Sequence, residues 1–143
     1  MIRLFTTAAC LTLATPVAVA APANFTPGLW ETSITFSVLE QSNTDATTDC
    51  MGPEEAQTEL SSLASEFATG MGCTAQNLKE GDNTVSFSMS CTPDSVFNAG
   101  NAVMTKVSDT NFSIEGDLSL TLPNQQDAVG KLRTNSRRVG ACS

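Results

Sequence analysis

The side chains that could do chemistry in this sequence are carboxylates, hydroxyls and thiols, because its 143 residues include no histidine and no tyrosine. A histidine-based triad, a histidine metal ligand and a histidine pH switch are therefore excluded. No G-x-S-x-G motif marks a nucleophilic serine. The sequence thus predicts no catalytic residue, no cofactor and no bound metal.

The acidic residues around position 50 come nearest to the pattern of a cation site. Asp45, Asp49, Glu54 and Glu55 are close in sequence, but their spacing does not match an EF-hand calcium loop. Glu54 and Glu55 directly follow Pro53, and a proline followed by acids is typical of the first turn of a helix. We interpret these two carboxylates as helix N-terminal charges.

Four of the seven basic residues fall in one C-terminal segment: Lys131, Arg133, Arg137 and Arg138. They could form a patch that binds anions, or they could be the solvent-facing side of an edge strand, where charges discourage aggregation. We favour the second interpretation. The chain carries a formal charge of −8 and has no basic stripe, so it is not expected to bind nucleic acid.

The first twenty residues have the pattern of an export signal. Arg3 gives a positive start, residues 4–13 are mostly apolar, and Ala18-Val19-Ala20 fits the small-x-small rule for cleavage. Cleavage before Ala21 would leave residues 21–143 as a single disulfide-stapled domain. Polar residues interrupt the apolar run, so we expect no membrane span. The expected location is the periplasm.

Four cysteines remain after the signal: Cys50, Cys73, Cys91 and Cys142. An even number of cysteines in a small exported chain indicates disulfide bonds. The spacings are wide and include no C-x-x-C pair, which is not typical of a zinc site or of a thiol oxidoreductase.

The segment between Cys73 and Cys91 predicts which cysteines pair. Residues 80–83 are a strong turn signal, and apolar residues then alternate with serines as they do in a strand. A hairpin around this turn places Cys73 opposite Cys91, within reach of a disulfide. Elimination leaves Cys50 with Cys142, so we predict the bonds Cys73–Cys91 and Cys50–Cys142.

Apolar residues recur with the periods of one helix and several strands. Residues 28–38 alternate as a half-buried strand, whereas residues 21–27 and 41–48 are polar and predict a lead segment and a loop. One helical stripe, expected between Pro53 and Gly70, consists of Ala56, Leu60, Leu63 and Phe67. Further strands are expected over residues 85–91, 102–107, 112–122 and 129–139, with a break at 98–101.

These elements predict an α+β fold, in which a curved antiparallel β-meander of about six strands has one amphipathic helix packed on it. The alternative is a small closed barrel of lipocalin type.

Several short motifs, taken in their order along the chain, resemble one family. These are PGLWE at 27–31, CMGPEEA at 50–56, the Cys73 and Cys91 pair, and GAC at 140–142. Together they resemble the DUF3617 family, small exported proteins of Gram-negative bacteria. The resemblance covers nearly all of the chain after the signal and implies export and a single domain. It implies no activity and no catalytic residue.

The apolar stripes on the first strand, the helix and the late strand predict a shared core, with a candidate ligand cavity near Trp30, Phe36 and Phe67. We therefore favour a non-catalytic periplasmic binding or interaction module whose partner is a small apolar ligand or an envelope protein. The alternatives are a cell-envelope structural or stress protein and a hydrolase that works without histidine. An apolar cavity would favour binding, and a cleft of converging carboxylates would favour an enzyme.

Overall fold

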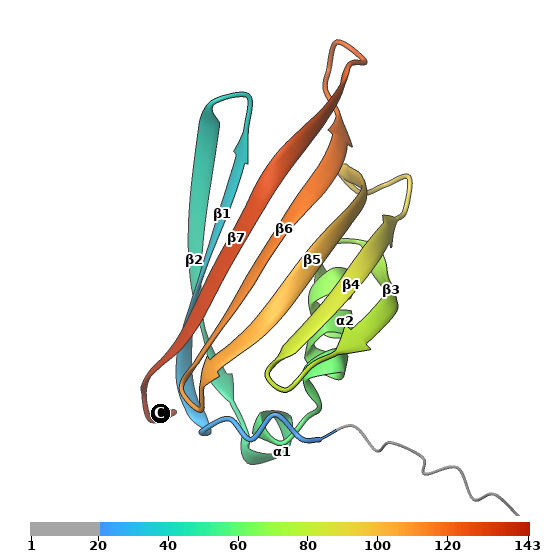
Figure 1. Cartoon of the computed structure of the whole chain (residues 1–143). Helices are drawn as coiled ribbons and strands as arrows, with labels where there is room; N and C mark the ends of the chain where they lie inside the picture. Colours follow the sequence, from blue (N-terminus) through green and yellow to red (C-terminus); the bar gives the residue numbers. More distant parts are fainter. Residues whose placement is uncertain (1–20) are drawn as a thin grey trace, which may run out of the picture.

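Seven antiparallel strands and two helices form the part of the chain that the structure, a computed structural model, describes, residues 21–143 (Figure 1). In chain order they are β1 Gly28–Val38, β2 Gln41–Met51, α1 Pro53–Ala56, α2 Leu60–Gly70, β3 Cys73–Glu80, β4 Thr84–Cys91, β5 Phe97–Ser108, β6 Asn111–Thr121 and β7 Asp127–Gly140. Neither helix within this range is long and apolar enough to cross a membrane. The predicted export signal, with Cys10, lies outside the described residues.

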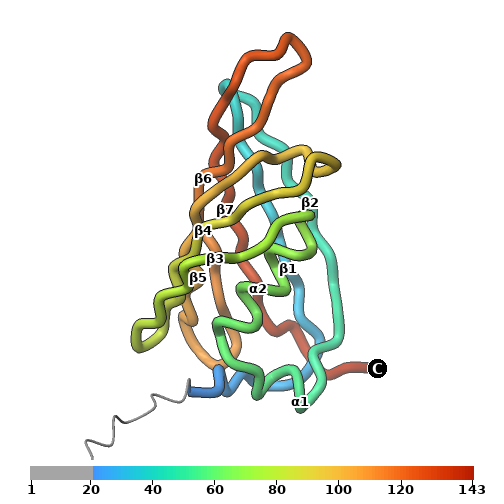
Figure 2. The backbone as a smooth tube through the Cα atoms, turned by 90° about the vertical axis from the view of Figure 1, so that its right-hand side faces the viewer, coloured from blue at the N-terminus to red at the C-terminus, as the bar shows by residue number. Residues whose placement is uncertain are grey.

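The strands form one sheet in the order β2-β1-β7-β6-β5-β4-β3 (Figures 1 and 2). Strands β3 to β7 are a meander, and β7 then pairs with β1, so the last strand lies beside the first. Within residues 21–143, β2 and β3 are the two edges of the sheet, which is open. The alternative of a closed barrel is therefore wrong, and the expected six strands are seven.

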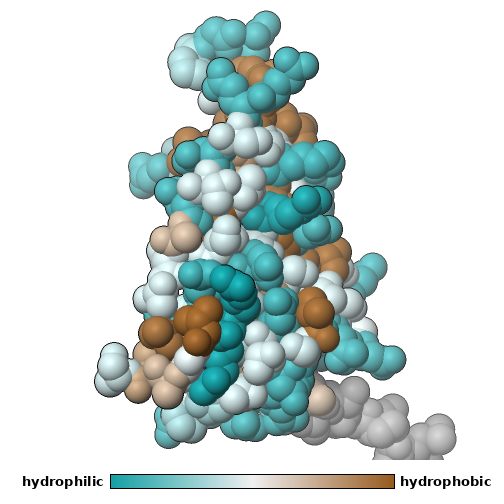
Figure 3. All heavy atoms as spheres, turned by 90° about the vertical axis from the view of Figure 1, so that its left-hand side faces the viewer, coloured by the Kyte–Doolittle hydropathy of each residue, from teal (hydrophilic) through white to brown (hydrophobic). Residues whose placement is uncertain are grey.

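The segment 41–48, predicted as a loop, is instead most of strand β2. It pairs with β1 in one unbroken register, from Val38 opposite Gln41 to Gly28 opposite Met51. The connecting residues Leu39 and Glu40 both have positive φ, as in the tight turns that suit the twist of a hairpin. Because β2 is an exposed edge strand, its side chains show no apolar alternation. Hydrophilic residues dominate the surface on this side of the molecule (Figure 3).

Strand β5 begins earlier than expected and includes the predicted break at 98–101. Gly100 lies within it, paired with Met89 of β4 and Leu118 of β6. A Cβ at this position would overlap the Leu118 side chain. The glycine therefore gives space to a buried leucine and does not end the strand.

The single helix expected between Pro53 and Gly70 is divided into α1 and α2. The residues just before the sheet explain the division, because the backbone N–H of Phe25 donates to the Ala56 carbonyl at 2.9 Å and that of Ala23 donates to the Thr58 carbonyl at 3.0 Å. Carbonyls that would continue the helical ladder are thus used by residues 21–27. This segment was expected to be a polar lead, but its Phe25 is buried in the core.

The core lies between α2 and one face of the sheet, which we call the inner face. Ala56, Leu60 and Leu63 of the predicted helical stripe are buried there, and Phe67 is partly buried. From the sheet, the buried apolar residues are Trp30, Met51, Cys73, Val85, Phe87, Met89, Ala102, Met104, Ile114, Leu118, Leu120 and Leu132. The opposite, outer face carries the polar residues of the alternating strands.

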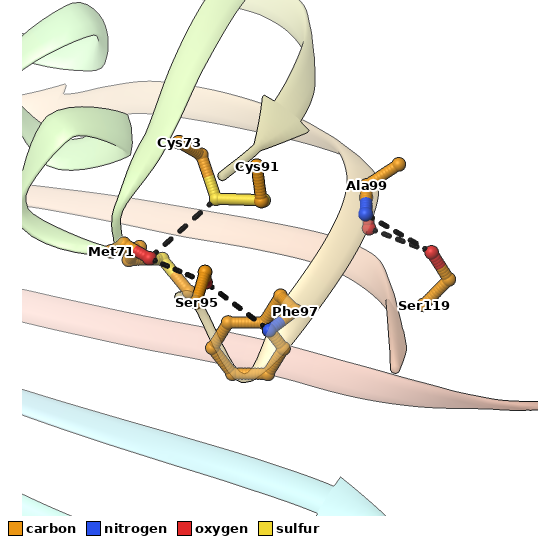
Figure 4. Close-up of a disulfide and its surroundings, with 7 residues drawn as sticks. All are labelled: Met71, Cys73, Cys91, Ser95, Phe97, Ala99 and Ser119. Atoms are coloured by element: carbon orange, nitrogen blue, oxygen red, sulfur yellow. Dashed lines mark hydrogen bonds between the residues drawn. A yellow bond between two sulfur atoms is a disulfide. The ribbon is translucent and has the colours of Figure 1, made fainter. Parts of the chain in front are cut away.

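Both disulfides join segments that the sheet brings together. Cys73 and Cys91 lie opposite each other in the β3–β4 register and are bonded, and Cys50 is bonded to Cys142. Near the first bond, the Ser95 hydroxyl donates to the Met71 carbonyl at 3.0 Å and accepts from the Phe97 N–H at 3.2 Å (Figure 4). The end of α2 is thereby tied to the start of β5.

Candidate functional site

A cavity of about 220 Å³ lies between the helices and the inner face of the sheet. It forms because α2 packs mainly against β3, β4 and β5, toward one edge of the sheet. The inner face of β1, β5, β6 and β7 supplies one wall, and α1, α2 and the end of β2 supply the other. Its apolar lining consists of Trp30, Ile34, Met51, Leu63, Phe67, Met104, Phe112 and Ile114.

Three packed aromatic rings hold one side of this cavity in place. The rings of Phe25 and Trp30 are 5.5 Å apart between centroids, and Phe112 lies 5.4 Å from Phe25 and 5.8 Å from Trp30. The indole Nε1 of Trp30 donates to the Thr26 carbonyl at 3.1 Å. Since its polar atom is satisfied and its rings are packed, Trp30 presents a fixed apolar surface to the cavity.

Two of the three aromatic residues proposed from the sequence meet at this cavity, and the third does not. Trp30 and Phe67 both line it. Phe36 instead packs against Phe97, with the ring centroids 5.3 Å apart, and is not part of the lining. Phe36 and Trp30 share a face of β1, but Phe36 lies six positions further along the strand, a rise of about 20 Å. Sharing a face therefore did not imply sharing a site.

The wall formed by β1 and β7 also carries hydroxyl groups. Thr32 and Ser136 are paired across the two strands and hydrogen-bonded through their side-chain oxygens at 2.8 Å. Thr134 is 1% exposed, lines the same cavity, and its Oγ1 has no hydrogen-bond partner. An unsatisfied buried hydroxyl typically costs about 1–3 kcal/mol. The cavity wall thus holds one buried hydroxyl group without a hydrogen-bond partner among the described residues.

Sequence reasoning did not single out these hydroxyl groups. Thr134 and Ser136 lie on β7, on the face opposite to its basic residues. Only the basic residues of this strand were considered as a binding patch. The available signal was the run Leu132, Thr134, Ser136 on one parity of a strand, where an entirely apolar set would be typical of a core.

Three carboxylates complete the lining, each from a different element. Asp49 lies near the end of β2, Glu55 on α1 and Glu66 on α2, and all three side chains are exposed. Within residues 21–143, no group of three or more acidic or cysteine side chains is close enough to hold a metal ion. The acids are therefore placed around the cavity rather than gathered at one point.

Comparison with family models shows the family of this chain. A family model described as a protein of unknown function, DUF3617, matches residues 25–142. The chain belongs to the DUF3617 family. Neither the curated proteins nor the solved structures contain a significant match to it.

The favoured interpretation of the basic residues of this DUF3617 chain, that they lie on an edge strand, is wrong. Strand β7 lies between β1 and β6, inside the sheet. Its outer-face basic residues meet acids of the neighbouring strands in three ion pairs: Lys131 with Asp117 at 2.8 Å, Arg133 with Glu115 at 3.1 Å, and Arg137 with Glu31 at 2.8 Å. Arg138 donates to the Pro27 carbonyl at 2.8 Å. The outer face is thus a ladder of paired charges.

One disulfide of the DUF3617 fold belongs to the cavity itself. Cys50 contributes to its lining, and its bond to Cys142 ties the end of β2 to the C-terminal segment after β7. Cys50 lies between Asp49 and Met51, which also line the cavity, so this bond joins the cavity-lining end of β2 to the C-terminal segment.

Proposed function

We propose that this DUF3617 protein is a non-catalytic binding module that holds a small, largely apolar ligand in the cavity between α2 and the sheet. The proposal rests on the composition of the cavity wall. Apolar side chains surround a buried Thr134 hydroxyl that has no partner. Ligand sites commonly combine an apolar lining with a few polar groups that orient the ligand.

The size of the cavity limits what it can hold. Its volume of about 220 Å³ is below the roughly 300–1,000 Å³ of typical drug-sized sites. An apolar cavity of about 150 Å³ is large enough for benzene. The proposed ligand is therefore either a short molecule or one apolar group of a longer one.

The placement of the acids supports binding over hydrolysis. Asp49, Glu55 and Glu66 are exposed side chains, whereas a general acid or base is usually tuned by burial and by a close charged neighbour. In addition, the sequence has no histidine to serve as a base. The histidine-free hydrolase therefore remains the least supported alternative.

We also propose that the protein acts in the periplasm. Two disulfides suit an oxidising compartment, and the pattern of the first twenty residues is that of an export signal. The intact mass of the protein recovered from the periplasm tests this proposal. We expect a chain that begins at Ala21, and retention of residues 1–20 would contradict it.

A second candidate function, as an envelope structural or interaction protein, is favoured by the free edge of β2. This strand has eleven residues, no proline and no bulge in its pairing with β1. A long regular edge is a template for pairing with a strand of another chain. Asp45 and Asp49 are its charged residues, and they oppose such pairing with an acidic strand.

The binding proposal can be tested with hexan-1-ol as an uncharged probe and with the fluorescence of Trp30, the single tryptophan of the chain. Ile34 lines the cavity but is 36% exposed, so Ile34→Phe should fill part of the space without unfolding the protein. The matched control is Val103→Phe, at a position that is 43% exposed and does not line the cavity.

The expected result is saturable binding of hexan-1-ol to the natural chain and to Val103→Phe, with binding lost in Ile34→Phe. Absence of saturable binding to the natural chain would overturn the proposal. Equal binding by the two variants would show that the probe sits elsewhere.

A further inference from the structure

The acids that line the cavity have no basic partner. In the described part of the chain the ion pairs use Glu31, Asp109, Glu115 and Asp117, none of which lines the cavity. Asp49, Glu55 and Glu66 have no cation of residues 21–143 within ion-pair distance. Among residues 21–143, the lining of this cavity therefore carries three acidic side chains that no basic side chain pairs.

This contrasts with the outer face of the same sheet. There each basic residue of the ladder lies opposite an acid in the strand register: Arg137 opposite Glu31, Arg133 opposite Glu115 and Lys131 opposite Asp117. The basic residue nearest to Trp30 in the register, Arg138, donates to the Pro27 carbonyl and does not line the cavity. Charge is thus neutralised on the outer face and left uncompensated at the cavity.

The Thr134 hydroxyl is a second observation that points to a ligand in the same cavity, on the wall that β7 supplies. Its side chain lies on the inner face, in register with the two cavity-lining residues Ile34 and Ile114. It is buried and unpartnered, although the neighbouring hydroxyls of Thr32 and Ser136 satisfy each other. A hydroxyl can both donate and accept, so it can orient either kind of polar atom on a ligand.

We infer that the cavity takes a small organic cation, with its apolar body against Trp30, Leu63 and Phe67 and its charged group toward Asp49, Glu55 and Glu66. This inference rests on the proposed binding function and adds the class of ligand. A metal ion does not fit, because the acids within residues 21–143 are not gathered closely enough to ligate one. A cation carried on an apolar body needs no such close coordination and also uses the apolar lining.

The charge preference can be measured with three probes that share a six-carbon chain: protonated hexan-1-amine, hexan-1-ol and heptanoate. Each is titrated against the full chain, expressed for export and purified with its disulfides intact, and binding is followed by Trp30 fluorescence and calorimetry. The amine should bind tightest and heptanoate weakest, with about a tenfold difference between them at low ionic strength. This difference should shrink in 1 M salt, because the acids are exposed and salt screens them.

Variants of the lining acids test the residues themselves. Glu55→Gln combined with Glu66→Gln should remove most of the preference for the amine and leave hexan-1-ol binding unchanged. The control combines Glu54→Gln with Glu40→Gln, which changes the net charge equally at exposed positions outside the lining. The control should keep the preference of the natural chain.

The possible failures can be told apart. If hexan-1-ol binds and heptanoate binds as tightly as the amine, the cation inference is wrong and the binding proposal stands. If the two double variants lose the preference equally, the net charge of the protein causes it and the lining acids do not. If none of the three probes binds, the proposed function fails together with the inference.

Discussion

The ring centroids of Trp30 and Phe112 are 5.8 Å apart, although strand β7 lies between the strands that carry them. On β7, the small Ser136 lies opposite both Thr32 and Phe112 in the register, two positions from Arg138, which lies opposite Trp30. A serine at this point of a buried face leaves room for two large rings from non-adjacent strands to meet. The aromatic side of the cavity therefore depends on a small polar residue of the strand between them.

Phe112→Ala should lower the free energy of unfolding by about 3 kcal/mol, the low end for a phenylalanine truncation, because Phe112 is only partly buried. It should also shift the emission of Trp30 to longer wavelength, since water can then reach the indole. Phe97→Ala is the control, because Phe97 is partly buried and contacts Phe36 instead. Denaturant titration and fluorescence spectra give the two readouts, and the same shift in both variants would contradict this packing.

The two disulfides should differ in how much they stabilise the protein. The Cys50–Cys142 bond spans 92 residues and the Cys73–Cys91 bond spans 18. Closing the longer loop restricts the unfolded chain more, by about 4.5 kcal/mol against about 3 kcal/mol. Removing both cysteines of the longer bridge should therefore cost about 1.5 kcal/mol more than removing both of the shorter one.

Urea denaturation of the two cysteine-pair variants measures that difference. Peptide mapping without reduction should recover Cys73 linked to Cys91 and Cys50 linked to Cys142. A peptide that joins Cys50 to Cys73 would show that the pairing is different.

The parts of the fold that local sequence determines are the parts that could be predicted. The turn between Cys73 and Cys91 lies within one short segment, so the register of that hairpin follows from neighbouring residues alone. The alternation in β1 and in β6 likewise reports a half-buried strand directly. The helical stripe from Ala56 to Phe67 identified the helix that covers the sheet, although not its interruption.

The parts that were missed depend on partners far away in the chain. Strand β2 has no apolar pattern because only its backbone is held, by β1. Phe25 lies in a segment with no strand or helix period, and its burial follows from two backbone hydrogen bonds that nearby sequence does not encode. Its own N–H donates to the Ala56 carbonyl, and the N–H of Thr26 donates to the Asp109 carbonyl. The polar wall of the cavity arises where β7 meets β1, about a hundred residues earlier in the sequence. No local period could show that Thr134 and Trp30 line the same space.

Gly130 is a further position where a small residue decides the packing. A Cβ at Gly130 would overlap the ring of Phe36, which lies over this point of β7. Gly130→Ala should therefore destabilise the protein by about 1–3 kcal/mol, the usual cost of overpacking a core. Gly140→Ala on the same strand meets no atom within 4 Å and should be close to neutral. Thermal unfolding of the two variants, followed by circular dichroism, provides the comparison, and equal melting temperatures would refute the contact.

The hydroxyls of Thr134 and Thr32 should respond in opposite ways to the same substitution. Valine keeps the shape of threonine and removes the hydroxyl. Because the Thr134 hydroxyl is buried and unpartnered, Thr134→Val should raise the free energy of unfolding by about 1 kcal/mol in the absence of ligand. Thr32→Val removes the partner of the Ser136 hydroxyl, which is itself buried, and should lower that free energy by about 1–2 kcal/mol.

Urea titrations of the two valine variants beside the natural chain measure both changes. A small molecule retained from purification would mask the gain at Thr134, so the protein is unfolded and refolded before measurement. Opposite signs would identify Thr134 as a polar group kept at a cost to stability, as expected of a residue that serves a ligand. A loss of stability in Thr134→Val similar to that in Thr32→Val would show that its hydroxyl already has a partner in solution, and the case for a free binding group on the cavity wall would fail.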